Sequence, residues 1–252
     1  METKRTTTVT KKQPTFFQWA TTSLTGQPPP PPKLKRKAPA PVKKLPGLIN
    51  DRPHVTLICG RKGSGKSFLC CKLLCSWEGW RGVYDEIIFV SPTFKSQFEG
   101  LWSKIDPTGV TVHEKIDEQF IENLLTTQST STKNSLLVLD DCGEDLRKVS
   151  PGTVNKLVSN SRHYKLSIIC LHQKLTQSPT IMRANADSIV SFAACSYLER
   201  DALWREVSTV DKKEFLRIFN AATNDKHSFL VSTIDKGGRL QFYHSDFATL
   251  VK

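Results

Sequence analysis

The feature that most constrains this chain is a glycine-rich segment of the form GxxxxGK[ST] that follows directly on an apolar run. It consists of Gly60, Arg61, Lys62, Gly63, Ser64, Gly65, Lys66 and Ser67. In a strand–loop–helix context, the glycines let backbone N–H groups curl around phosphates, and the helix N-terminus adds a partial positive charge. Lys66 would then reach the β- and γ-phosphates, and the Ser67 hydroxyl would bind magnesium. The segment predicts a P-loop that binds a nucleoside triphosphate with Mg²⁺.

A second apolar run, residues 136–139, ends in two acids, Asp140 and Asp141. Acids that follow a buried strand emerge at the sheet edge where ligands bind in open α/β folds. Asp140 fits the Walker B role, holding magnesium through water opposite Ser67, and Asp141 fits the residue that polarises the attacking water. Glutamate is more usual at this second position, so Glu144 is kept as an alternative. Paired acids after a strand also cap helices.

A third apolar run, residues 166–171, ends in His172 and Gln173. If its strand is parallel to that of Asp140, both polar ends meet at one sheet edge. A glutamine there can sense the γ-phosphate and orient water. The alternative is a polar strand end that only faces solvent.

The overall pattern alternates short apolar runs with amphipathic segments from His54 onward. Such alternation predicts a parallel sheet with helices on both faces. The expected strands are 54–59, 86–90, 136–140, 166–171 and 188–192, and the expected helices are 66–77, 94–104, 117–128, 151–162, 178–186, 198–206 and 211–222. A closing hairpin is expected at 228–233 and 239–243, turned at Gly237-Gly238. The predicted fold class is a three-layer αβα P-loop NTPase with a mostly parallel sheet and a C-terminal hairpin.

The strand expected at 86–90 lies between the P-loop helix and the strand of Asp140 along the chain. An inserted strand favours the RecA-like ATPases that carry an additional strand and a catalytic acid beside Walker B. The sequence contains no NKxD segment for guanine and no obvious lid of clustered arginines. ATP is therefore favoured over GTP.

Residues 1–50 differ in composition from residues 51–252, which are expected to form the ATPase domain. The first fifty hold nine of the fourteen prolines, and ten lysines or arginines against one acid, Glu2. A stretch with so few regularly spaced apolar residues is expected to be disordered. The basic clusters at 33–37 and 43–44 suggest a nuclear localisation signal, a loose nucleic-acid contact or a solvated linker. Phe16, Phe17 and Trp19 suggest a short docking element.

The cellular setting follows from what the chain lacks. No apolar run reaches the length of a membrane span, and the basic N-terminus shows no secretory signal. The seven cysteines show no spacing typical of a metal site, so buried free thiols are expected. We therefore expect a protein of a reducing, intracellular compartment.

Five segments taken in order resemble a known family: GRKGSGKS, EIIFVSPT, LLVLDDCGED, NSRHYKLSIICLHQ and NADSIVSF. This order is similar to the poxvirus-type genome-packaging ATPases of large DNA viruses, polintons and virophages, within the FtsK–HerA superfamily. The similarity covers about residues 53–195. It implies an ATP-hydrolysing motor that forms a homo-oligomeric ring and moves double-stranded DNA into a capsid. Capsid or portal-type viral proteins are the implied partners, and the basic tail fits a host nucleus, with association to the virion as a further option.

The resemblance also assigns roles to individual residues. Lys66 and Ser67 match its Walker A, Asp140 and Asp141 its Walker B, and Gln173 its polar sensor. Arg162 is a candidate arginine finger or DNA contact, and Arg183 is a candidate for action across a subunit boundary. Both arginines could instead form surface salt bridges.

Two other functions are compatible with the same residues. A helicase or replication initiator of another P-loop class would separate strands and prefer single-stranded DNA, although no aromatic stacking ladder is evident. A nucleotide-gated binding module would bind ATP with little turnover, and the aspartate at position 141 keeps this option open.

Overall fold

The computed structural model describes residues 45–97, 100–193, 196–207 and 209–251. The chain divides into two units, Met1–Pro39 and Ala40–Lys252. The first unit lies outside the described residues. The expected proline-rich spacer, basic clusters and aromatic docking element fall there or at residues 43–44, so they stay predictions. The fold below is that of the second unit.

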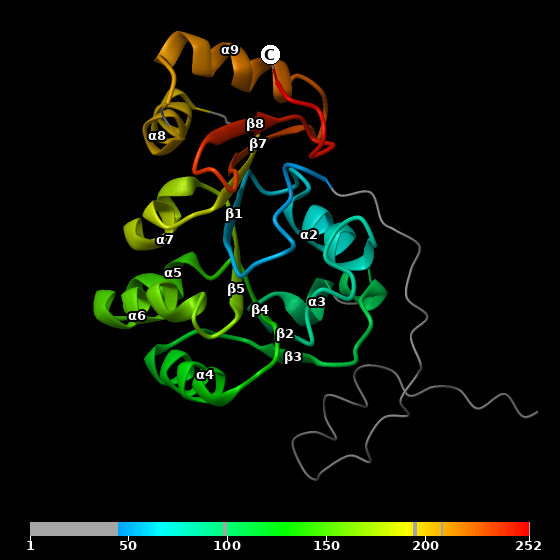
Figure 1. Ribbon diagram of the computed structural model, residues 1–252, viewed down its shortest axis with the longest axis vertical. Helices are drawn as coiled ribbons and strands as arrows, with labels where there is room; N and C mark the ends of the chain where they lie inside the picture. The colour runs from blue at the N-terminus through cyan, green and yellow to red at the C-terminus, as the bar shows by residue number, and fades with distance from the viewer. Residues whose placement is uncertain (1–44, 98–99, 194–195, 208, 252) are drawn as a thin grey trace, which may run out of the picture. The chain divides into compact units, whose positions relative to one another are not determined.

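Within the described residues, eight strands form one sheet, and Figure 1 shows it at the centre of the folded unit. The strand order across the sheet is β3-β2-β4-β5-β1-β6-β7-β8. Neighbouring strands from β3 to β6 pair in parallel, and β7 and β8 pair antiparallel. The strands are β1 (Val55–Cys59), β2 (Glu86–Val90), β3 (Val110–His113), β4 (Ser135–Asp140), β5 (Leu166–His172), β6 (Ser188–Phe192), β7 (Phe229–Ile234) and β8 (Leu240–Tyr243).

Helices cover both faces of the sheet, which gives three layers (Figure 1). One face carries α2 (Lys66–Cys75), α3 (Phe94–Gln97) and a 3₁₀ turn at Trp102–Lys104. The other face carries α4 (Glu118–Thr130), α5 (Gly143–Lys148), α6 (Pro151–Ser161) and α7 (Thr180–Ala184), continued by α8 (Tyr197–Val207) and α9 (Lys212–Ala222). The predicted αβα class and mostly parallel sheet are confirmed.

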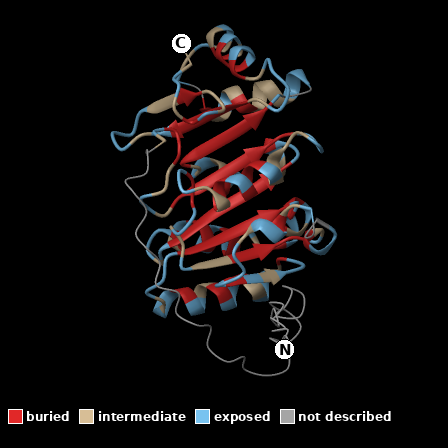
Figure 2. Cartoon of the chain, turned by 90° about the vertical axis from the view of Figure 1, so that its right-hand side faces the viewer, coloured by how far each residue is buried: buried red, intermediate tan, exposed pale blue. Residues whose placement is uncertain are grey.

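Burial follows from this layering, and Figure 2 shows the central strands buried along nearly their whole length. Leu57 packs into the core under α4 to α9, whereas its neighbour Ile58 is equally buried but faces the α2 side. Alternate residues of a strand point to opposite faces, so a strand covered on both sides must be apolar throughout. This is why the central strands are continuous runs of leucine, isoleucine and valine.

The closing hairpin also forms as the sequence predicts. β7 and β8 pair antiparallel beside β6, and the turn between them lies at Asp235–Arg239. The Asp235 amide donates to the Arg239 carbonyl at 2.9 Å, and Gly238 has φ of 76°. A positive φ suits glycine, which has no Cβ.

Three local features differ from the expectation. β3 and α5 were not expected, because a strand of four residues and a helix of six are too short to show a clear period. The expected helix 94–104 is divided into α3 and the 3₁₀ turn at Trp102. Gly100 falls between the two pieces and disfavours a continuous helix. Trp102 packs instead against Phe89 of β2, with ring centroids 5.0 Å apart.

The folded unit begins earlier than residue 51. Leu48 is buried, and the Gly47 amide donates to the Phe247 carbonyl at 2.8 Å. The Trp80 indole N–H donates to the Ile49 carbonyl at 2.8 Å. The boundary predicted after residue 50 is therefore a few residues too late. A short apolar stretch beside Pro46 gave no sign of these long-range contacts.

The strand inserted between the P-loop strand and the strand of Asp140 is not the one that the sequence predicts. In the sheet, β5 separates the P-loop strand β1 from β4, which carries Asp140. β2, the strand at 86–90 that the sequence singled out, lies on the far side of β4. Chain order alone does not fix lateral order in a sheet, because a crossover can place a later strand between two earlier ones.

Candidate nucleotide-binding site

The P-loop joins the carboxyl end of β1 to the first turn of α2. Gly63 and Gly65 have φ of 78° and 108°, a region that L side chains rarely adopt. A Cβ on Gly60 would lie 2.7 Å from Ser64 Oγ and 2.8 Å from Phe192 Cβ. These glycines are therefore required by the path of the backbone. The loop presents the open N-terminus of α2, where no side chain caps the first turn and anions bind well.

Lys66 is held against the loop that it follows. Its ammonium donates to the Gly60 carbonyl at 2.7 Å and to the Arg61 carbonyl at 3.0 Å. Burial lowers the pKa of Lys66, while the carboxylates of Asp140 and Asp141 raise it. An ammonium has three donors, so one remains for a phosphate oxygen. The lysine is thus positioned at the mouth of the P-loop.

Ser67 and Asp140 face each other beneath the loop. Ser67 Oγ lies 3.4 Å from Asp140 Oδ2 and 3.5 Å from Oδ1, longer than an ordinary O–H···O hydrogen bond. The Asp140 side chain is 4% exposed, and burial raises its pKa from 3.8 to about 6, with Asp141 adding to the rise. The fold therefore keeps a carboxylate in a place where a nearby cation would stabilise it.

The pair fits a magnesium ion in part. A hydroxyl and a carboxylate are the hard oxygen ligands that Mg²⁺ prefers, and this ion commonly completes its shell with water and substrate phosphates. The described residues contain no group of three or more His, Cys, Asp or Glu side chains that would hold a metal ion. Ser67 and Asp140 would thus hold Mg²⁺ together with a bound triphosphate, and not by themselves.

Asp141 occupies an unusual backbone position. Its φ is 59°, in the left-handed region, and its amide donates to the Leu171 carbonyl at 3.2 Å. Aspartate and asparagine tolerate this conformation better than most residues. The conformation gives a physical reason for aspartate where glutamate is more usual.

Gln173 lies next to Asp141, as the sequence predicts. Gln173 Nε2 lies 3.4 Å from Asp141 Oδ1, a long contact. Its loop is fixed by Gln177, whose Oε1 accepts the backbone amides of Gln173 at 2.9 Å and Lys174 at 3.0 Å. His172, the other polar residue at this strand end, is buried, and burial lowers its pKa to about 4. Gln173 is therefore the member of the pair that faces the cleft.

These groups line one cleft of about 520 Å³ along the carboxyl edge of the sheet. The lining contains Gly63, Gly65, Lys66 and Ser67 from the P-loop, with Asp140, Asp141 and Gln173 from the neighbouring strand ends. Phe68, Thr93 and Ser96 also line the cleft, and the sequence prediction missed them. The position of Thr93 just after strand β2 was the available signal, because all parallel strands end at this edge.

Three residues considered for catalysis lie elsewhere. Glu144 is largely exposed and pairs with Arg147 at 3.0 Å, and it does not line the cleft. Arg183 Nε lies 3.2 Å from Glu206 Oε2 on the helical layer. The structure does not bring Arg162 to the P-loop of its own chain. It precedes β5 and so lies at the amino edge of the sheet, whereas Gln173 follows the same strand at the carboxyl edge.

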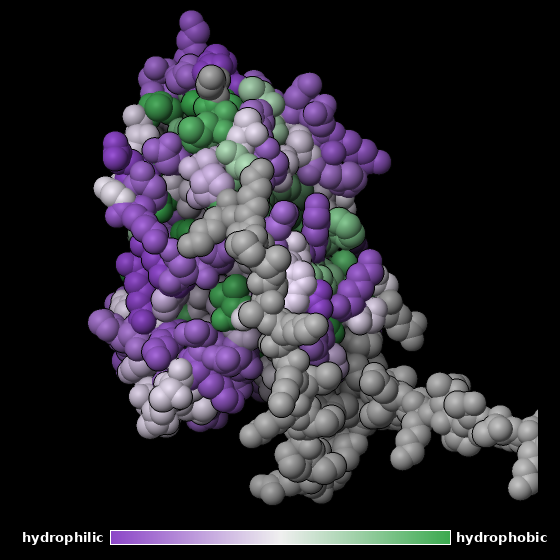
Figure 3. All heavy atoms as spheres, turned by 45° about the vertical axis from the view of Figure 1, so that its right-hand side comes forward, coloured by the Kyte–Doolittle hydropathy of each residue, from purple (hydrophilic) through white to green (hydrophobic). Residues whose placement is uncertain are grey.

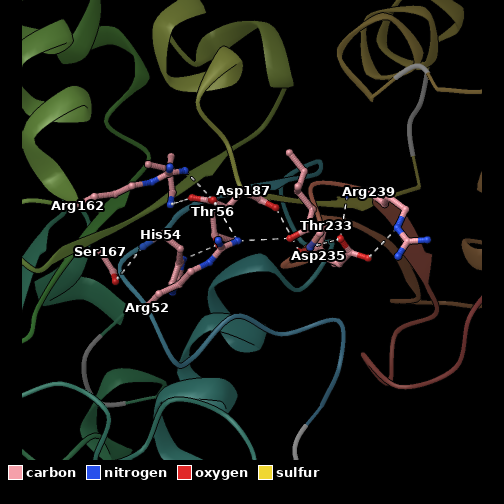
Figure 4. Close-up of polar contacts among 12 residues, drawn as sticks. Arg52, His54, Thr56, Arg162, Ser167, Asp187, Thr233, Asp235 and Arg239 are labelled. Atoms are coloured by element: carbon pink, nitrogen blue, oxygen red, sulfur yellow. Dashed lines mark hydrogen bonds and ion pairs between the residues drawn. The ribbon is translucent and has the colours of Figure 1, made fainter.

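At the amino edge, Arg162 pairs with the buried Asp187, and Figure 4 shows Arg52 approaching the same carboxylate. Arg162 Nη2 lies 2.8 Å from Asp187 Oδ1, and Arg52 Nη2 lies 3.5 Å from it. The Val55 amide donates to Asp187 Oδ2 at 3.0 Å. This arrangement ties the starts of β1, β5 and β6 together, which is a structural contact within the chain.

The remaining expectations concern the cysteines and the membrane. Cys59, Cys70, Cys71, Cys142 and Cys170 are buried free thiols, as predicted, while Cys75 is half-buried and Cys195 lies outside the described residues. Among the residues that the structure describes, no helix has both the length and the apolar character needed to cross a membrane.

The sequence matches a known family over most of its length. The family described as Poxvirus A32 protein matches residues 47–235, which include all of the cleft residues named above.

Two viral proteins show sequence similarity. An uncharacterised protein, 075L, of Invertebrate iridescent virus 6 is 30% identical over 142 residues, covering 54% of this chain. The chain spans only 53% of the length of that relative. The DNA packaging protein OPG160 of Variola virus is 24% identical over 203 residues, covering 77% of this chain and 70% of the relative.

Solved structures support the same fold. The genome packaging NTPase B204 of Sulfolobus turreted icosahedral virus 2, in complex with ATP-gammaS, matches with a TM-score of 0.55 at 18% identity. The match covers 77% of this chain and 97% of B204. The AMPPCP complex of the same protein gives a TM-score of 0.53 at 17% identity. Identities this low establish a shared fold alone.

Proposed function

This chain belongs to the Poxvirus A32 protein family, and from that premise we propose that it is an ATP-hydrolysing motor that translocates double-stranded DNA to package a viral genome. The related Variola protein is named for DNA packaging, and B204 is a packaging NTPase with nucleotide-bound structures. The observation that carries the proposal is the cleft in which Lys66, Ser67, Asp140, Asp141 and Gln173 meet.

The proposed chemistry is the transfer of the γ-phosphoryl group to water. Such reactions depend on positioning and on charge neutralisation more than on covalent chemistry with the protein. The P-loop amides and Lys66 would hold the phosphates, and Ser67 and Asp140 would hold Mg²⁺, which would neutralise phosphate charge. Asp141 accepts a proton from the attacking water, and Gln173 orients that water.

The test is ATP hydrolysis by the full chain with and without linear double-stranded DNA. We expect duplex DNA to raise the turnover, and Asp141→Asn to lower it by about 10²-fold or more. Asn keeps the size of the side chain and tolerates the left-handed backbone, so it removes only the proton acceptor. Asp145→Asn, on the neighbouring helix α5, is the matched control and should hydrolyse ATP like the wild type.

The same assay separates the alternatives. Stimulation by single-stranded DNA in preference to duplex DNA would favour a helicase or initiator. Tight ATP binding with background hydrolysis, even with duplex DNA, would favour a nucleotide-gated binding module. One observation favours the nucleotide-gated binding module. Gln173 Nε2 contacts Asp141 Oδ1, and this contact occupies the carboxylate that would have to accept a proton during hydrolysis.

We further propose that the motor acts as a homo-oligomeric ring with a capsid or portal-type viral protein as its docking partner. Native mass measured with ATP and DNA tests the ring, and a monomer under those conditions would contradict it. Localisation to the host nucleus, with association to the virion, also stays a proposal. It depends on the basic clusters at 33–37 and 43–44, and a fluorescent reporter fused to residues 1–50 tests it.

A further inference from the structure

A second, larger cavity of about 730 Å³ adjoins the P-loop on the side away from the two acids. Asp140, Asp141 and Gln173 line the phosphate cleft but not this cavity. The two hollows meet at Gly65 and Phe68, which line both. A ligand that begins in the cleft and extends past Gly65 therefore enters this cavity.

The direction of a bound triphosphate follows from the positions of the catalytic groups. Asp141 and Gln173 act on the terminal phosphate, so this phosphate must lie at their end of the cleft. The chain of phosphates runs back along the P-loop from there, and its other end carries the nucleoside. That end lies at Gly65 and Phe68, where the larger cavity opens.

The cavity has apolar walls and one exposed aromatic ring, Phe68. Phe192, Phe229 and Phe247 are buried and pack against one another at tilted angles, with ring centroids 5.0 Å apart for the first pair and 5.5 Å apart for the second, and they form an apolar floor. Leu69 and Leu73 of α2 contribute the opposite wall. Phe68 is 59% exposed at the junction, an unusual exposure for a large apolar side chain. Figure 3 shows one face of the molecule, on which apolar residues form separate patches among mostly hydrophilic residues.

Several polar groups of the cavity are already engaged within their own loops. The Asp246 carboxylate accepts the amides of Ala248 and Thr249 and the Thr249 hydroxyl, at 2.6 to 2.9 Å. The Ser245 hydroxyl is hydrogen-bonded to the backbone of Phe229. These groups offer little for reading the edge of a base. Stacking, which every base can provide, is the interaction that the exposed Phe68 ring offers.

His227 connects this cavity to the P-loop. It lines the cavity just before β7, and its Nδ1 lies 2.9 Å from the Ser64 carbonyl oxygen. A carbonyl only accepts, so Nδ1 carries the proton and Nε2 of the neutral ring is an acceptor. An acceptor at the junction of the two cavities suits a ribose hydroxyl.

We propose that this cavity binds the purine nucleoside of the nucleotide whose phosphates the P-loop holds, chiefly by stacking on the exposed ring of Phe68. The inference rests on the proposed function, because it requires a triphosphate in the cleft. The exposed Lys72 and Glu78 also line the cavity, but stacking does not distinguish adenine from guanine, so we expect the two to bind with similar affinity. Purines are favoured over pyrimidines because the larger ring system covers more apolar surface.

The test is calorimetric titration of the full chain with Mg·ATP, Mg·GTP, Mg·CTP and inorganic triphosphate with Mg²⁺. We expect the wild type to bind ATP at least about ten-fold more tightly than triphosphate, GTP within about five-fold of ATP, and CTP more weakly than either. Phe68→Ala should weaken ATP and GTP binding by about ten-fold and leave triphosphate binding within about two-fold. Phe68→Trp should retain the affinity for ATP.

Tyr197→Ala is the matched control, because Tyr197 is also 59% exposed and does not line the cavity. It should bind every ligand like the wild type. If ATP binds no more tightly than triphosphate, the nucleoside gains nothing from the cavity, and the inference fails while the proposed function stands. An equal loss of ATP and triphosphate binding in Phe68→Ala would also overturn it. A wild type that binds neither ligand would overturn the proposed function as well.

Discussion

The two edges of the sheet each contain a buried aspartate, and their surroundings differ. Asp140 at the carboxyl edge and Asp187 at the amino edge are both 4% exposed. Asp187 has a guanidinium at 2.8 Å, a second at 3.5 Å and a backbone amide at 3.0 Å. Burial, with the neighbouring Asp141 carboxylate, raises the pKa of Asp140 to about 6, and the Lys66 ammonium and the Ser67 hydroxyl, 3.4 Å away, offset only part of this rise.

The difference in partners distinguishes Asp187, a structural carboxylate, from Asp140, a functional one. A buried charge is stable when partners of opposite charge and hydrogen-bond donors surround it. Asp187 has them within its own chain. Among the described residues Asp140 forms no ion pair, because the Lys66 ammonium is hydrogen-bonded to the carbonyls of its own loop, and a nucleotide with Mg²⁺ at the P-loop would supply a partner cation. Burial by itself would not have distinguished the two.

The largest effect on the carboxyl edge is expected from Lys66→Ala. It removes the cation that the P-loop holds toward the β- and γ-phosphates, so ATP hydrolysis should fall by about 10³-fold or more. The melting temperature should change little, because Lys66 bonds only to carbonyls of its own loop. Steady-state phosphate release measures the effect. Lys156→Ala, an exposed lysine on α6, is the control, and a Lys66→Ala protein with normal turnover would contradict the assigned site.

At the amino edge, Asp187→Ala should lower the free energy of unfolding by about 3 kcal/mol, because it removes the shared partner of Arg162, Arg52 and the Val55 amide. Glu114→Ala breaks the exposed pair with Lys95 and should leave the free energy of unfolding nearly unchanged, because solvent screens this pair. Urea unfolding measures both. Equal costs would remove the distinction between a buried network and a surface pair.

The pH dependence of stability should reveal the uncompensated state of Asp140. Its pKa in the folded chain, about 6, lies above its ordinary value of 3.8, so its contribution to stability is fully present below about pH 4 and is lost as the pH rises through 6. Asp140→Asn should therefore stabilise the metal-free protein by about 2 kcal/mol at pH 7.5 and much less at pH 4.5. Urea unfolding in a chelator at both pH values tests this. A pH-independent difference would contradict the pKa assigned to Asp140.

A smaller loss in stability than that of Asp187→Ala is expected from Arg162→Ala. The Arg162 side chain is 60% exposed, and Arg52 and the Val55 amide still reach Asp187, so the loss in stability should be about 1 kcal/mol. The turnover number should stay within about two-fold of the wild type. A 10²-fold fall in turnover with unchanged stability would instead show that Arg162 acts as an arginine finger on a neighbouring subunit.

The sequence predicted the carboxyl edge better than the amino edge. Asp140, Asp141 and Gln173 follow apolar runs, and parallel strands bring such ends together, so their meeting could be foreseen. The position of Arg162 could also be predicted, because Arg162 precedes the strand 166–171 whereas Gln173 follows that strand. The resemblance predicts an arginine finger or DNA contact for Arg162, and its action on a neighbouring subunit stays a prediction.

Other features could not be read locally. The lateral order that places β5 between β1 and β4 depends on crossovers, which chain order does not determine. The contact of His227 with the Ser64 carbonyl joins residues 163 positions apart. The left-handed backbone of Asp141 arises from the turn between β4 and α5, and only the aspartate itself hinted at it. Long-range packing and short elements account for most of what was missed.

The most direct test of this account compares ATP hydrolysis by Asp140→Asn and Asp187→Asn, measured per folded molecule at a temperature where both variants are folded. The same isosteric change then removes one buried charge at each edge. We expect hydrolysis by Asp140→Asn to fall by about 10²-fold or more, and that by Asp187→Asn to stay within about two-fold of the wild type. Equal losses in the two variants, or a normal rate in Asp140→Asn, would contradict the assignment of the carboxyl edge as the site of ATP hydrolysis.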